Sequence, residues 1–397
     1  MVGETIYLAV AWSLAALVAV PVATVVFEIL AAMCWRGRAA EHRVARTPVP
    51  STVVLVPAHN EAAGIARTLR SVSAGLPAGF RILCVAHNCT DGTASVARHW
   101  GADVVEVVDD GTGGKPAALA AGLRALEAVA PDVVVVVDAD CVVEKKAVEI
   151  LARHAHAMQC PVMGTYLFDA ARKQQKSTLS SLAILLKNFI RPLGLHVLGM
   201  PCLINGSGSA YPFRLLRDLP LGKGSIAEDY QMAIDLLRRG YPTRFVPQAR
   251  IFGRLPARQA TALTQRRRWE HGQLWLTFRT APGLIWEGVV AKDVRRLALG
   301  LEVLVPPLAF LGMMWIAALA FTVPLLAFQA EGGPLLLLLI AGAALVIAIL
   351  GGWLRFAGIS HTLSALGALP GYLLWKLPLY RDYFNRRETR WMKTARD

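Results

Sequence analysis

The chain alternates between two kinds of hydrophobic pattern. Long and largely apolar runs occupy residues 6–29, 297–328 and 335–353. Each run is long enough to cross about 30 Å of hydrocarbon as an α-helix. Between the first run and the second, short apolar strings take turns with stretches of helical period. This alternation predicts parallel strands that are joined by right-handed helical crossovers.

The short apolar strings predict five strands. They lie at residues 52–56, 81–86, 102–108, 133–140 and 160–168. A turn and a helical pattern follow each of the first three strands, and a helix is expected over 145–158. The fourth strand begins with five consecutive valines, which is typical of a strand that is buried on both faces.

Two carboxylates stand where the fourth strand is expected to end. Asp138 and Asp140 are two residues apart, so alternation along a strand places both side chains on one side. In open α/β sheets the ligand crevice lies outside the carboxyl ends of the strands. Carboxylate oxygens at this edge suit Mg²⁺ or Mn²⁺, which can neutralise the phosphates of a nucleotide. An ordinary acidic turn is the alternative, because the tripeptide DxD is common.

Composition and charge point to a membrane. The hydrophobic fraction of 55% is higher than is usual for soluble domains. The formal net charge is also strongly positive, at +14. Basic residues such as Arg36, Arg38, Arg43 and Arg46 flank the apolar runs, as they do beside anionic bilayers. The sequence has no zinc-finger, helix-turn-helix or basic-zipper pattern. We therefore expect membrane lipids as partners and no nucleic acid.

The first apolar run has the flanks of a transmembrane helix rather than those of a signal peptide. An acidic MVGET precedes it and arginines follow it. The positive-inside rule then places the N-terminus outside and the next segment in the cytosol. We expect a multi-pass protein of the inner (plasma) membrane.

This topology divides the chain into five segments. They are an N-terminal transmembrane helix with its flank (1–36), a cytosolic domain (37–270), interfacial helices (271–296), two transmembrane helices (297–356), and an interfacial helix with a basic cytosolic tail (357–397). The run at 297–328 contains three prolines, so we expect a kinked or tilted span. Residues 357–377 could span the membrane or lie on it.

Seven short motifs follow one another between residues 57 and 269. They are PAHNEA, HNCTDGT, GGKPAAL, VDAD, NGSGSAY, AEDYQM and QRRRW. In this order they resemble family 2 glycosyltransferases, particularly the membrane-embedded synthases of cellulose, chitin and hyaluronan. The resemblance implies an α/β, Rossmann-like domain of the GT-A fold, an α-helical transmembrane region, a UDP-sugar donor, and inversion at the anomeric carbon.

The resemblance also implies which residues bind the donor. They are Pro57, Ala58, Asn60, Glu61, His87, Asp91, Lys115, Asp138 and Arg268, with Asp138 and Asp140 holding Mg²⁺ or Mn²⁺. His87 stands where the family commonly has the aspartate that contacts the base, and Ala120 stands where relatives often carry Asn or Asp. A histidine can still hydrogen-bond a uracil edge, whereas the alanine removes a polar contact.

Catalysis and acceptor binding are implied for the later motifs. Asp229, beside Glu228, matches the family's general base, although an acidic pair at a helix start also serves as a cap. The acceptor-binding residues implied are Gly206, Ser207, Gly208, Gln265 and Trp269. Arg268 offers a planar fork to phosphate oxygens, and Trp269 offers a flat face to a sugar ring.

The sequence thus predicts a metal-dependent, inverting hexosyltransferase that extends a β-linked polysaccharide at the cytosolic membrane face. Three spans are few for an export path, so a second copy or an export partner is expected to complete one. Transfer of a single sugar to a lipid, as in ceramide or hopanoid glucosyltransferases, is the first alternative. A catalytically weak membrane subunit that binds a nucleotide sugar is the second.

Overall fold

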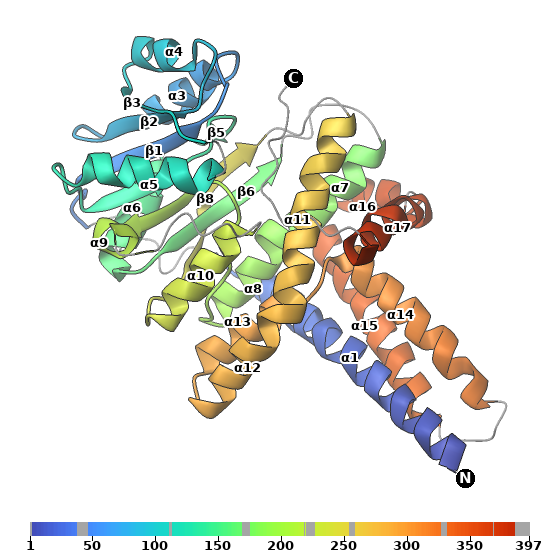
Figure 1. The fold of residues 1–397 in the computed structure, drawn as a ribbon. Coiled ribbons are helices and arrows are strands. Elements are labelled where there is room, and N and C mark those ends of the chain that lie inside the picture. Colours follow the sequence, from blue (N-terminus) through green and yellow to red (C-terminus); the bar gives the residue numbers. More distant parts are fainter. Residues whose placement is uncertain are drawn as a thin grey trace. The chain divides into compact units, whose positions relative to one another are not determined.

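The computed structural model describes residues 2–37, 47–110, 113–168, 175–217, 219, 227–253, 259–326, 332–367 and 369–385. Arg38, Arg43, Arg46 and the predicted basic tail beyond residue 385 lie outside these ranges. The described residues form an α/β unit and a helical unit. Figure 1 shows the helices and strands of both units.

The α/β unit falls within residues 36–171 and 200–272. The range 37–270 that we predict for the cytosolic domain also includes residues 172–199, which group with the helical unit. The elements of the α/β unit are β1 (Thr52–Ala58), α3 (Ile65–Ser73), β2 (Arg81–His87), α4 (Thr93–His99), β3 (Asp103–Val107), α5 (Gly114–Leu126), β4 (Val133–Val136), β5 (Val142–Val143), α6 (Ala147–Met158), β6 (Val162–Phe168), β7 (Ser209–Pro212), α9 (Phe213–Arg217), α10 (Glu228–Arg238), β8 (Arg244–Gly253) and the first part of α11 (Gln259–Arg279).

These strands form one eight-stranded sheet in the order β3-β2-β1-β4-β7-β6-β8-β5. The first four strands in this order are parallel, as predicted. The chain runs outward from β1 to β3 and then returns to β4 on the other side of β1. Ligands of open α/β sheets bind at such a reversal. The candidate crevice therefore lies at the carboxyl ends of β1 and β4.

The rest of the sheet is mixed, which the sequence pattern does not predict. β7 is antiparallel to both β4 and β6, and β5 is antiparallel to β8. β7 consists of only four residues, of which Ser209–Tyr211 end the motif NGSGSAY, which we expect to be a glycine-rich loop. A run this short shows no alternation that a sequence pattern could reveal.

Valines account for the central strands. All four residues of β4 are buried, as are Val53–Val56 of β1, so these strands contact protein on both faces. Helices α3 and α4 cover one face of the parallel half and α5 covers the other (Figure 1). Helix α5 packs closely, because a Cβ atom at Gly122 would lie 2.5 Å from the Leu55 side chain.

The helical unit falls within residues 1–35, 172–199 and 273–387. Its elements are α1 (Val2–Met33), α7 (Gln175–Leu185), the π-helix η1 (Leu186–Ile190), α8 (Arg191–Val197), the last part of α11, α12 (Ala281–Val290), α13 (Val294–Leu304), α14 (Leu308–Thr322), the 3₁₀-helix η2 (Val323–Leu326), α15 (Gly333–Phe356), α16 (Ile359–Leu366) and α17 (Leu369–Asn385).

Two of these helices are long and apolar enough to cross a membrane, namely α1 over Glu4–Met33 and α15. Helices α13 and α14 pass the same test as a pair, although they are bent by 75° at a short break. The break coincides with Pro306 and Pro307, since proline cannot continue the backbone ladder of a helix. The expected kink in this run is thus confirmed, and it is sharper than a tilt.

The long helices pack through small and branched side chains. Ala15, Val18 and Val22 of α1 form a cluster with Leu311 of α14 and Leu338 of α15. Helix α8 also approaches α1 closely. A Cβ atom at its Gly194 would lie 1.9 Å from the backbone oxygen of Glu28, so only glycine permits this contact.

Three of the buried charged side chains in the helical unit form one group. Arg191 of α8 is 3% exposed, and it pairs with Glu28 of α1 at 2.6 Å and with Glu302 of α13. The two carboxylates are themselves only 2% and 7% exposed. One guanidinium therefore joins three helices that are far apart in the sequence, and we call this group the buried charge cluster.

Candidate functional site

The loops after β1 and β2 are fastened to each other at the crevice. The side-chain oxygen of Asn60 accepts from the N–H of Thr90 at 2.8 Å. Asn60 has a φ of 53°, a left-handed conformation that asparagine tolerates. The two carboxylate oxygens of Asp91 accept from the N–H groups of Ala62 and Thr93, each at 3.0 Å. Asn60 and Asp91, both predicted donor-binding residues, thus lie in one linked pair of loops.

The other predicted donor residues near these loops are mostly buried. Pro57 and Ala58 are part of β1, and Ala58 is buried. Glu61 is buried, and its N–H donates to Thr93 Oγ1 at 2.8 Å. For Asp91, burial works against the charge, but hydrogen bonds from Thr93 and Ala62 lower its pKa. Asp91 is therefore ionised and serves here as an acceptor that joins the loops.

His87 is the last residue of β2, and the carboxylate of Asp109 lies beside its ring. The ring is buried, and its Nε2 lies 2.7 Å from Asp109 Oδ2. The other oxygen of Asp109 accepts from Asn88 Nδ2 at 2.6 Å. The structure thus brings an acidic side chain next to the position where the resembling family has aspartate. The sequence pattern alone misses Asp109, because it follows β3 in an acidic loop that resembles an ordinary turn.

Four segments meet around Lys115 at the start of α5. Its Nζ lies 2.8 Å from Asp138 Oδ1 and 3.8 Å from Asp229 Oδ1, and it donates to the backbone oxygen of Gly206 at 3.2 Å. Burial disfavours the ammonium, but Asp138 and Asp229 raise the pKa of Lys115. Lys115 is therefore charged, and it gathers a predicted metal ligand, the predicted general base and the predicted acceptor loop.

The acceptor loop is also joined to the aspartate turn. The N–H of Asp138 donates to Ser207 Oγ at 2.9 Å, and the N–H of Gly208 donates to the oxygen of Val136 at 2.9 Å. Gly206 and Gly208 have φ values of 69° and 86°, which favour glycine. The Ser207 side chain is fully buried, so its hydroxyl supports the turn.

The carboxyl of Asp229 lies among apolar side chains and other charges. It lines a small cavity together with Leu119 and Met232. Burial raises the pKa of Asp229 to about 7, with Lys115 opposing the shift and Glu228 adding to it. Because burial disfavours an ionised carboxylate, Asp229 can exchange a proton near neutral pH. Burial likewise raises the pKa of Glu228, although Lys115 and Arg268 oppose that shift.

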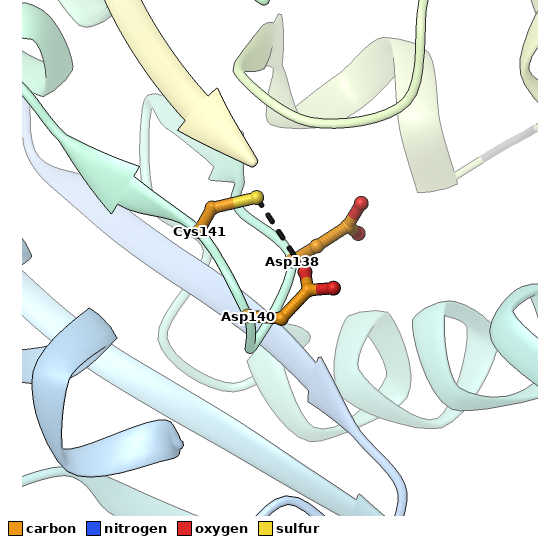
Figure 2. A group of neighbouring side chains, drawn as sticks. All are labelled: Asp138, Asp140 and Cys141. Atoms are coloured by element: carbon orange, nitrogen blue, oxygen red, sulfur yellow. Dashed lines mark hydrogen bonds between the residues drawn. The ribbon is translucent and has the colours of Figure 1, made fainter. Parts of the chain in front are cut away.

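The fourth strand ends earlier than we predict, at Val136, so Asp138 and Asp140 lie on a turn rather than on a strand. The turn is closed by a hydrogen bond from the N–H of Cys141 to the oxygen of Asp138, at 3.2 Å. One ligand atom from each of Asp138, Asp140 and Cys141 lies within 4.8 Å of the others. Figure 2 shows the three side chains projecting from this turn. The two carboxylates are the donors that Mg²⁺ or Mn²⁺ prefers.

A row of aromatic rings borders the same turn. Tyr166 and Phe168 on β6 have ring centroids 5.0 Å apart, and Phe168 lies 5.9 Å from Trp269 of α11. The hydroxyl of Tyr166 lies 4.0 Å from Cys141 Sγ. No sequence pattern marks Tyr166 and Phe168, because only packing between β6 and α11 aligns them with the predicted acceptor residue Trp269. Gln265 and Arg268 are half-buried on the same helix.

Residues 50–272 match the family model described as "Glycosyltransferase like family 2". No curated protein sequence matches the chain. Among solved structures, the chain is similar to the mannosyltransferase PcManGT from Pyrobaculum calidifontis in complex with GDP-Man and Mn²⁺, with 19% identity over 91% of this chain and 99% of that chain and a TM-score of 0.49.

The chain is also similar to glucosyl-3-phosphoglycerate synthase from Mycobacterium tuberculosis. The complex of that enzyme with Mn²⁺, UDP and phosphoglyceric acid is 22% identical over 59% of this chain and 80% of that chain, with a TM-score of 0.40. Its complex with Mg²⁺ and UDP is 22% identical over 60% of this chain and 84% of that chain, with a TM-score of 0.41.

Proposed function

Because the family model covers more than half of its residues, the chain belongs to the glycosyltransferase-like family 2, and we propose that it moves a hexose from a UDP-sugar to an acceptor hydroxyl with inversion. The observation that carries this proposal is the meeting of Lys115, Asp138 and Asp229 at the reversal of strand order. A cation, a candidate metal ligand and a carboxyl with a pKa near neutrality occupy one crevice.

Each of these groups has a role in the proposed reaction. Asp229 accepts the proton of the acceptor hydroxyl as that oxygen attacks the anomeric carbon. Lys115 and Arg268 would supply positive charge to the diphosphate that departs with its bonding electron pair. A divalent ion held by Asp138 and Asp140 would supply further positive charge to that leaving group. The loops after β1 and β2 would hold the nucleotide, with Asp109 beside His87 at the base.

For the acceptor we propose a growing β-linked polysaccharide at the cytosolic face of the inner membrane. The aromatic row from Tyr166 to Trp269 favours sugar rings, because such rings present apolar faces that aromatic side chains can cover. The two long apolar helices and the bent pair favour a multi-pass protein with its N-terminus outside. A second copy or an export partner would complete a path for the product.

A lipid acceptor that receives one sugar is the second candidate. The exposed apolar residues of the hairpin of α12 and α13 favour it, because they suit a membrane surface. Trp286 and Val290 are 69% and 64% exposed there. On such a surface a membrane-embedded acceptor could approach the enzyme without leaving the bilayer.

Reconstitution would test both candidates. The full chain in lipid nanodiscs, with Mg²⁺ or Mn²⁺, is offered a panel of UDP-sugars while UDP release is followed and products are sized. A ladder or a high polymer from one donor supports the polysaccharide. A single-sugar product that extracts into organic solvent selects the lipid acceptor. If no donor releases UDP, the proposed transfer is wrong and a nucleotide-sugar-binding subunit takes its place.

Asp140→Ala should weaken the metal-dependent binding of UDP by at least about tenfold, since even changes beyond the ligands of a metal site have effects of this size. The affinity of UDP without metal should change little. Calorimetric titration with and without Mn²⁺ measures both values. Asp103→Ala is the matched control, because Asp103 is an exposed carboxylate that pairs with Arg81 at 2.8 Å. Equal metal-dependent binding by Asp140→Ala and the native chain would remove Asp140 from the metal site.

The rate of transfer should depend on pH through Asp229. A general base must be ionised, and the pKa of Asp229 is about 7. With saturating donor, kcat should therefore rise about tenfold per pH unit on the acidic side and level off above neutrality. Asp235→Asn, which changes a half-buried carboxylate on the same helix, should leave this profile unaltered. A rate that is constant across the acidic range would contradict the assignment.

A further inference from the structure

The aspartate turn carries a third side chain that the proposed mechanism does not use. Cys141 follows Asp140 directly and is fully buried, although both neighbouring carboxylates are half-exposed. Its Sγ lies 3.6 Å from Asp140 Oδ1 (Figure 2). The thiol thus faces the same space as the carboxylates. In the structure the thiol is an S–H donor to this oxygen of Asp140.

The spacing of these atoms matches that of ligands on one ion. With a metal–sulfur distance of about 2.3 Å and a metal–oxygen distance of about 2.1 Å, a tetrahedral site separates sulfur from oxygen by about 3.6 Å. The Cys141 and Asp140 atoms already have this separation. The remaining ligand atom, from Asp138, lies within 4.8 Å of both. Small side-chain rotations would therefore suffice to enclose a cation.

The backbone of the turn holds these side chains together. The N–H of Cys141 donates to the oxygen of Asp138, and the N–H of Asp138 donates to Ser207 Oγ. Tyr166 closes the far side of the sulfur with its hydroxyl at 4.0 Å. The Nζ of Lys115 pairs with Oδ1 of Asp138 at 2.8 Å. A cation would therefore bind the second oxygen of that carboxylate.

We propose that Cys141 is a sulfur ligand of this metal site and that it gives the site a preference for thiophilic divalent cations such as Co²⁺, Zn²⁺ and Cd²⁺ over Mg²⁺. Thiolates select soft and borderline ions, whereas carboxylates alone favour hard ones. When such a cation binds, the thiol releases its proton to solvent and the sulfur lone pair forms the metal bond. Mg²⁺ uses the carboxylates and leaves the thiol protonated. This inference adds a ligand to the metal site of the proposed function, and it rests on that function.

Cobalt reports sulfur ligation directly. Titration of the full chain in detergent with Co²⁺ should produce a sulfur-to-cobalt charge-transfer absorption that saturates at one ion per chain. Cys141→Ser should lose this absorption and weaken Co²⁺ binding by about tenfold or more, while the affinity for Mn²⁺, measured by electron paramagnetic resonance, changes much less. Cys160→Ser removes another buried thiol of the same unit and should keep the absorption.

The opposite results would overturn sulfur ligation. They are a native chain without the absorption, or a Cys141→Ser variant that keeps it. Cys141→Ala and Asp140→Asn provide further variants if Cys141→Ser does not fold, because the first should lose the absorption and the second should weaken Co²⁺ binding. The readout is independent of sugar transfer. If the absorption appears in a protein that releases no UDP from any donor, sulfur ligation stands and the proposed function fails.

Discussion

An Asp229→Asn variant should transfer sugar about 10²–10⁴ times more slowly than the native chain, which is the usual contribution of a general base. The amide has the shape of the carboxyl but cannot accept the proton of the acceptor hydroxyl. The 2.8 Å contact between Lys115 and Asp138 does not involve Asp229, so the donor and the metal should bind with little change. Single-turnover kinetics of UDP-sugar consumption, together with calorimetry of UDP and Mn²⁺, separates the two effects.

Asp235→Asn is the matched control for this prediction. Asp235 lies on the same helix, α10, and its carboxylate accepts from Gln231 at 2.8 Å, away from Lys115. The same change of side chain there should leave kcat within about twofold of the native value, as surface substitutions usually do. If Asp229→Asn turns over like the native chain, Asp229 is not the base, and Glu228 becomes the carboxyl to replace next.

The second large effect concerns stability. Arg191→Met should destabilise the helical unit by about 3–5 kcal/mol, because it leaves the buried carboxylates of Glu28 and Glu302 without their cation. Glu28→Gln should cost much less, since Arg191 and Glu302 remain as a pair of opposite charges. Thermal unfolding in detergent, followed by near-ultraviolet circular dichroism, should rank the native chain and Glu28→Gln above Arg191→Met.

Arg296→Met provides the comparison on the surface. Arg296 pairs with Asp293 at 3.2 Å, and both side chains are about a third exposed. Partly exposed pairs contribute about 0–1 kcal/mol, so this variant should unfold near the native temperature. Equal losses for Arg191→Met and Arg296→Met would show that the buried charge cluster does not hold α1, α8 and α13 together.

Patterns of side chains predict those features that lie within single segments. The valines of β1 and β4 predict buried strands, and the prolines at 306 and 307 predict a bent helix. The short strand β7 escapes notice because Ser209–Pro212 alternates over too few residues. The predicted boundaries 37–270 include residues 172–199, because only tertiary packing shows that Arg191 belongs with Glu28 and Glu302.

The candidate site divides in the same way. Sequence motifs mark Asp138, Asp140 and Asp229. The structure places Asp138 and Asp229 beside Lys115. His87 can be picked out as a departure from its family, but its partner Asp109 cannot, because the two come from different strands. Tyr166 and Phe168 likewise become part of the site only when β6 and α11 pack together. Sequence patterns do not predict contacts between side chains of distant segments.

The linked loops after β1 and β2, which we propose to hold the nucleotide, have a consequence for the thermodynamics of donor binding. Asn60 and Asp91 fix these loops through hydrogen bonds to backbone N–H groups before any ligand arrives. Ordering a free loop costs a protein about 1–2 kcal/mol per residue in lost conformational entropy. Here that entropy is already lost when the protein folds, so the binding energy of the nucleotide can go into affinity rather than into ordering its own pocket.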